Sequence, residues 1–158
     1  MDKIEQKICD IIDAHRDELI AFGEDLWTHA ELGFQEFRTA EKFAEKMKGL
    51  GLRTQEGLAV TGVKSYLKDD AHGPTVCLMG EFDGLPIPTH AYANPETGAA
   101  HCCGHHAQAT GVVGAAIALK KNVQTAAEAA EAIGIGLQSF CIPGSVAEDR
   151  KVGLGHGN

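Results

Sequence analysis

The chain has 158 residues, a length that suits one domain with a buried core. Its 44% hydrophobic and 23% charged residues are typical of a globular protein in water. The net charge of −8 argues against nucleic acids and anionic membranes as partners, because both attract basic surfaces. No apolar run is long enough to cross a bilayer and no signal peptide is recognisable, so we expect a cytoplasmic protein.

Helical periodicity dominates the first third of the chain. Apolar residues recur at spacings of three, four and seven over residues 2–29, which predicts one long amphipathic helix. A second helix is predicted over residues 37–50, where glycines end it. Apolar and polar residues alternate loosely over residues 58–67, which indicates a strand or one arm of a hairpin.

Strands and helices are predicted to alternate in the rest of the chain. The apolar run at residues 75–80 is typical of a strand covered on both faces, and residues 84–100 form a loop rich in Pro, Gly and Asn. A helix of small residues follows over 107–121. Further along, residues 125–132 favour a helix and residues 135–142 a strand. This alternation implies an α/β layered fold.

The five cysteines do not form a disulfide framework. Their number is odd and their spacing irregular, and an intracellular chain keeps its thiols reduced. We expect Cys9 and Cys77 to be small core residues, because both lie in apolar patterns. A vicinal disulfide between Cys102 and Cys103 is disfavoured.

Residues 101–106 (HCCGHH) gather two thiols and three imidazoles within six positions. Cysteine and histidine are the side chains that hold zinc and similar metals. The cluster follows a predicted strand and loop and precedes a helix, where ligands collect in α/β folds. Cys103 and His105 can converge on one ion from a bent loop, with His101 and His106 nearby.

The alternative is a loop that happens to carry surface histidines and a buried cysteine. A structural zinc site is disfavoured, because it needs a second Cys/His pair. An open catalytic site fits better.

Two carboxylates precede this cluster at the end of the predicted strand. Alternation places Glu81 and Asp83 on the same side, where one of them can fix the tautomer of a ligating imidazole. The alternative is a solvated strand end. A cysteine nucleophile with a histidine base is a further option for Cys103 and His105, although a spacing of one intervening residue makes that geometry awkward.

Several motifs together resemble a known family. Residues 80–87 (GEFDGLPI) followed by residues 101–108 (HCCGHHAQ) are similar to the paired motifs of the aminoacylase/carboxypeptidase metallohydrolases, peptidase family M-20. Residues 22–34 (FGEDLWTHAELGF) and 94–100 (NPETGAA) resemble its amidohydrolase branch, which includes aminobenzoyl-glutamate and auxin-conjugate hydrolases. The resemblance covers roughly residues 10–120.

This resemblance implies a three-layer αβα zinc-peptidase-like (phosphorylase/hydrolase-like) catalytic domain. It also implies two divalent metal ions, zinc or manganese, and hydrolysis of an amide bond in a small molecule by metal-activated water. Cys103 and His105 match metal ligands in the motif, and Asp83 matches the carboxylate that orients a ligand. A glutamate shuttles the proton in this chemistry.

The sequence departs from the family pattern in two places. His106 stands where the branch has Asp or Asn, so either the local charge is altered or His106 is an extra ligand. The family's Pro-Ala-Glu-Glu element is interrupted after Pro143. Either a short insertion moves the general base to Glu148 and a metal ligand to Asp149, or this pair is lost.

Family members are much longer than this chain. We therefore expect residues 1–158 to be the N-terminal part of a metallohydrolase catalytic domain, truncated, without the lid and dimerisation domain and without the C-terminal part. The expected function is hydrolysis of N-acyl amino acids or peptide-like amides, with the activity of the truncated chain left open. The alternative is a non-catalytic metal-binding fragment that self-associates into a homo-oligomer through exposed edges.

Overall fold

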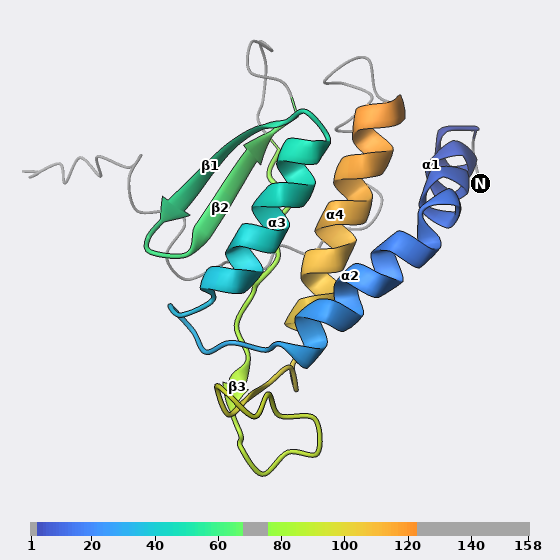
Figure 1. Ribbon diagram of the computed structural model, residues 1–158. Coiled ribbons are helices and arrows are strands. Elements are labelled where there is room, and N and C mark those ends of the chain that lie inside the picture. The colour runs from blue at the N-terminus through green and yellow to red at the C-terminus, as the bar shows by residue number, and fades with distance from the viewer. Residues whose placement is uncertain (1–2, 68–75, 123–158) are drawn as a thin grey trace, which may run out of the picture.

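The computed structural model describes residues 3–67 and 76–122. Four helices, α1 (Lys3–Ala14), α2 (Arg16–Thr28), α3 (Phe37–Gly49) and α4 (His105–Asn122), surround the core. Two small antiparallel pairs accompany them: β1 (Arg53–Leu58) with β2 (Gly62–Tyr66), and β3 (Leu85–Pro86) with β4 (Ala99–Ala100). In Figure 1, α4 lies between α2 and α3, and the β1–β2 hairpin lies on the far side of α3. This mixture of helices and small sheets is compatible with the predicted α/β class.

The core lies where α2, α3 and α4 meet. Leu26 and Val113 are almost fully buried there, and the remaining members are apolar side chains from all three helices together with Leu52, which precedes β1. The helix predicted over residues 37–50 is confirmed as α3, and the helix of small residues is confirmed as α4. Gly51, at φ +70°, ends the α3 segment in the left-handed conformation that glycine adopts at no steric cost.

The single long helix predicted over residues 2–29 is wrong, because the chain bends at His15. There the backbone leaves helical geometry (φ −107°, ψ 11°), and α1 and α2 follow different directions (Figure 1). The imidazole of His15 contacts Lys121, at the end of α4. The bend allows Ile11 to pack beside the core while α2 runs along α4.

Two glycines allow close approach to α4. A Cβ atom on Gly23 would lie 2.9 Å from Oγ1 of Thr110, so α2 and α4 approach closely at this point. A Cβ atom on Gly80 would lie 3.3 Å from the backbone of Gln108, so the extended segment before β3 runs directly against α4. The absence of a side chain at Gly23 and Gly80 therefore lets α2 and the segment before β3 pack closely against the first turns of α4.

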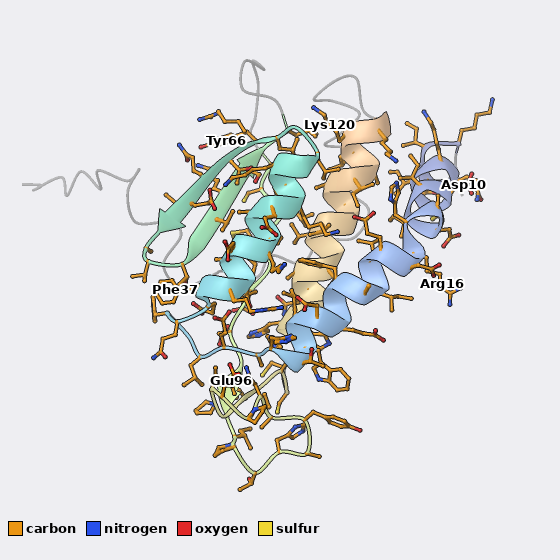
Figure 2. All side chains as sticks on the ribbon, viewed as in Figure 1. Asp10, Arg16, Phe37, Tyr66, Glu96 and Lys120 are labelled. Atoms are coloured by element: carbon orange, nitrogen blue, oxygen red, sulfur yellow. The ribbon has the colours of Figure 1, made fainter. Side chains whose placement is uncertain are left out.

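The hairpin confirms the strand predicted at residues 58–67 and adds a first arm, β1, that the sequence did not reveal. Its register pairs Arg53 with Tyr66 and Thr54 with Ser65, whose hydroxyls lie 3.0 Å apart. The register shifts between Gln55 and Leu58. Figure 2 shows Tyr66 on the hairpin and Phe37 at the start of α3.

Two predictions about the segment before the site are wrong. Residues 76–80 are not in a strand, and Val76 is 49% exposed rather than covered on both faces. Cys77 and Cys9 are exposed instead of lying in the core. A covered strand needs paired neighbours, and the part of the chain that the structure describes supplies none for residues 76–80.

The other element predictions have different outcomes. The loop predicted over residues 84–100 is confirmed, with β3 and β4 joining its two ends. The helix predicted at residues 125–132 and the strand predicted at 135–142 lie outside the described residues. Within residues 3–67 and 76–122, no helix combines the length and apolar character needed to cross a membrane.

Candidate functional site

The structure brings two of the predicted site residues together. His105, the first residue of α4, places Nδ1 2.8 Å from the backbone oxygen and 2.9 Å from Oδ1 of Asp83. Both partners are acceptors, so Nδ1 carries the proton. The imidazole is 13% exposed, and Asp83 therefore fixes its tautomer and orientation in a partly dry environment.

Glu81 completes this arrangement, although the predicted site did not include it as a ligand. Its Oε2 lies 3.0 Å from Nε2 of His105. When Nδ1 holds the proton, Nε2 of a neutral imidazole is an acceptor, and so is the carboxylate that faces it. Two facing acceptors need a cation between them, either a second ring proton or a metal ion. The sequence signal was the alternation that places Glu81 and Asp83 on one side.

The segment that carries both carboxylates is held at its two ends. The backbone N–H of Glu81 contacts Oε1 of Gln108, one turn into α4, at 3.3 Å. The N–H of Gly84 donates to the backbone oxygen of Glu31 at 2.7 Å, and Leu32 pairs with Gly84 in a parallel bridge. The turn between α2 and α3 therefore determines where Asp83 lies.

Glu31 also caps α3. Its carboxylate accepts hydrogen bonds from the backbone N–H groups of Arg38 at 3.1 Å and Thr39 at 2.8 Å. These N–H groups have no partner inside the helix, and a negative charge at a helix N-terminus is favourable. One residue thus links the start of α3 to the segment that carries Asp83.

The motif at residues 94–100 is a structural turn that presents His101. The side chains of Asn94 and Thr97 donate to the backbone oxygen of Ala30 at 3.0 and 2.6 Å, which fixes the loop to the end of α2. Gly98 adopts φ +68° and donates to the backbone oxygen of Asn94. Figure 2 shows Glu96, within this turn, on the loop that extends beyond the ends of α2 and α4.

His101 and His106 form a pair of imidazoles beside the group around His105. His101 is 7% exposed, and its ring lies 5.2 Å from that of His106. Burial, with a smaller contribution from the neighbouring histidines, lowers the pKa of His101 to about 4. Burial also lowers the pKa of His106, followed by the effect of His105. Both rings are therefore in the neutral, metal-binding form at neutral pH.

The predicted ligand Cys103 lies on the surface. Cys102 and Cys103 are both exposed free thiols, as expected without a vicinal disulfide. Among the residues that the structure describes, no three His, Cys, Asp or Glu side chains are gathered closely enough to hold a metal ion. Glu148 and Asp149 lie outside the described residues. The described site is therefore the group of Asp83, His105 and Glu81, with the pair of His101 and His106 beside it.

The chain is similar in sequence to curated hydrolases that include a deacetylase, an amidohydrolase and a carboxypeptidase. The chain is 31% identical over 66% of its length to N-acetyl-L-cysteine deacetylase of Bacillus subtilis. It is 29% identical over 70% of its length to N-acyl-L-amino acid amidohydrolase of Geobacillus stearothermophilus. It is 28% identical over 77% of its length to thermostable carboxypeptidase 1 of Saccharolobus solfataricus. The chain spans only 26% to 32% of the length of these relatives.

These similarities confirm the resemblance that the motifs indicate. The chain resembles the N-terminal part of the aminoacylase and carboxypeptidase hydrolases of peptidase family M-20. A second similarity covers residues 96–158, which match the family described as GGGtGRT protein. This match includes the stretch after Pro143 in which the sequence departs from the metallohydrolase pattern.

Proposed function

We propose that the chain forms the N-terminal part of a metal-dependent amidohydrolase catalytic domain of the three-layer αβα type. The substrate class is a small molecule with an amide bond, such as an N-acyl amino acid or a peptide-like conjugate. The observation that supports this proposal is the arrangement around His105: Nδ1 is bound to Asp83, and Nε2 faces the Glu81 carboxylate at 3.0 Å.

Two of the residues present, His105 and Glu81, have the ligand chemistry of a divalent metal site. An imidazole nitrogen and a carboxylate oxygen are ligands that zinc and manganese accept, and a carboxylate behind the imidazole is the usual support for such a ligand. His105 and Glu81 would hold the ion, and Cys103, which the family motif marks as a ligand, would complete the site from the adjacent loop. A bound ion of this kind lowers the pKa of a water molecule and polarises the scissile carbonyl.

The protein residues have separate roles in this proposal. Asp83 is a positioning residue, because it holds the proton on Nδ1 and leaves Nε2 available for coordination. Glu148 is proposed to move the proton between water and the leaving amine, and Asp149 to be a further ligand. A non-catalytic metal-binding fragment is the alternative function, and it predicts metal binding without turnover.

Hydrolysis and metal binding measured on the same protein samples test the proposal. The full chain is incubated with N-acetyl amino acids and with aminobenzoyl-glutamate in the presence of Zn²⁺ or Mn²⁺. We expect metal-dependent turnover that disappears in His105→Gln and persists in His29→Gln, which removes an exposed histidine at the end of α2. Asp83→Asn should weaken Zn²⁺ binding about 10- to 100-fold, the usual effect of losing a supporting carboxylate. Zn²⁺ binding without turnover with either metal would favour the alternative.

A further inference from the structure

His101 is buried without a well-formed hydrogen bond to either ring nitrogen. Only 7% of the residue is exposed, yet neither Nδ1 nor Nε2 has a partner at ordinary hydrogen-bond geometry, and the backbone of Asp83 provides only a weak contact. A neutral imidazole carries one donor and one acceptor, and leaving such groups buried and unpaired costs about 1–3 kcal/mol each. Buried polar groups in folded proteins nearly always have a partner, so this ring points to a bound species.

The neighbouring, partly buried ring of His106 has one such nitrogen. Its Nδ1 is buried without a partner, and the two ring centres lie 5.2 Å apart with an interplanar angle of 44°. In zinc sites the metal–nitrogen distance is about 2.0–2.1 Å, which places each ring centre about 3.2 Å from the ion. Two imidazoles on one tetrahedral ion therefore have centres about 5 Å apart, which matches the spacing of His101 and His106.

We propose that His101 and His106 together bind one divalent transition-metal ion, at a position distinct from Nε2 of His105. The proposal rests on the proposed function only in assuming that the chain binds such metals. Two imidazole ligands favour Zn²⁺, Co²⁺, Ni²⁺ or Cu²⁺ over Mg²⁺ and Mn²⁺, which prefer oxygen ligands.

The two positions are separate because they use different imidazole rings. His105 has both ring nitrogens engaged, one with Asp83 and the other with Glu81. His101 follows β4, which the Asn94 turn fixes to α2, and His106 lies in the first turn of α4. Because His106 is the next residue after His105, an ion at each position places two metals side by side at the start of α4.

Trp27 reports on this second position. It is the only tryptophan in the chain, and its ring stacks near that of His106, with centres 6.2 Å apart and an interplanar angle of 23°. Co²⁺ quenches indole fluorescence at such short range. An ion bound by His101 and His106 is therefore detected optically, without any measurement of activity.

The test is a Co²⁺ titration of the full chain, followed by Trp27 fluorescence and by equilibrium dialysis. In the wild-type chain we expect saturable quenching. In His101→Gln/His106→Gln, quenching is lost or needs on the order of tenfold more Co²⁺, and dialysis shows one ion fewer per chain. In His105→Gln the quenching persists while the other ion is lost. His29→Gln is the matched control and behaves as wild type.

The outcomes separate this inference from the proposed function. If the double variant keeps both the quenching and the full stoichiometry, the His101–His106 site is refuted and the His105 site is unaffected. If the double variant loses its ion while His105→Gln loses none, the second site stands and the proposed metal at His105 fails. As a check that does not depend on the variants folding, Zn²⁺ should shift the ring ¹⁵N resonances of His101 and His106 in the wild-type chain. Unchanged resonances at saturating Zn²⁺ would overturn the inference.

Discussion

The close approach of α2 and α4 at Gly23 makes the effect of one substitution depend on its neighbour. In Gly23→Ala the new Cβ would lie 2.9 Å from Oγ1 of Thr110. That hydroxyl cannot simply rotate away, because it donates to the backbone oxygen of His106 at 2.7 Å. Overpacking of this kind costs about 1–3 kcal/mol, whereas alanine gains about 1 kcal/mol over glycine inside a helix. We expect a net loss of about 0–2 kcal/mol in the free energy of unfolding.

Without the Thr110 hydroxyl, Gly23→Ala should raise the free energy of unfolding instead of lowering it. In a Thr110→Ala background the nearest remaining side-chain atom, Cβ, is at an ordinary contact distance of 3.7 Å. Gly23→Ala should then stabilise the protein by about 1 kcal/mol through helix propensity alone. The two substitutions are therefore coupled, by about 1–3 kcal/mol.

Urea unfolding of the four proteins in this cycle, followed by Trp27 fluorescence and far-UV circular dichroism, measures the coupling. Gly111→Ala is the control, because a Cβ atom at this exposed position on α4 meets nothing within 4 Å. It should stabilise the wild type and the Thr110→Ala variant equally, by about 1 kcal/mol. If Gly23→Ala changes the unfolding free energy by the same amount in both backgrounds, the close contact between Gly23 and Thr110 does not limit helix packing.

Two further predictions concern the supports around the site. Glu31→Ala removes the acceptor for the N–H groups of Arg38 and Thr39, so it should lower the unfolding free energy by about 1–2 kcal/mol in urea, while Glu41→Gln on the exposed face of α3 leaves it unchanged. The Arg38 guanidinium donates to Asp25 at 2.7 Å and holds the pKa of Asp25 below its ordinary 3.8. A lowered carboxylate pKa stabilises the fold above about pH 4, and this stabilisation is lost as the pH falls through the lowered pKa. Because the pair is about one-third exposed, Asp25→Asn should cost only about 0.5 kcal/mol at pH 7, and the difference from wild type should narrow at pH 3; a constant difference would contradict the assignment.

Periodicity predicted the helices because burial of an apolar face determines them locally. It did not reveal the bend at His15, since this residue is an ordinary helix member in sequence and the contact that accompanies the bend comes from Lys121, 106 residues away. The failed strand at residues 76–80 has the opposite cause. Its apolar run favoured a strand, but a strand exists only where a neighbouring backbone pairs with it.

The candidate site was predictable to the extent that it is local. The motif predicted that a carboxylate, Asp83, orients a metal ligand, and alternation placed Glu81 on the same side; the structure shows both carboxylates in contact with His105, although residues 81–83 are not in a strand. The burial of His101 was not predictable from residue type, because histidine is as common on surfaces as inside. It depends on Asn94 and Thr97 reaching the oxygen of Ala30, more than 60 residues earlier in the chain.

The spacing of the two imidazole positions is therefore set outside residues 101–106. Ala30 accepts the hydrogen bonds that anchor the loop before His101, and the next residue, Glu31, accepts the N–H of Gly84 and so fixes the segment that carries Asp83. Consecutive backbone oxygens in one turn thus position the buried His101 and the carboxylate that orients His105. The N-terminal signature at residues 22–34 therefore has a structural role, because its turn at Ala30 and Glu31 positions the later cluster of histidines.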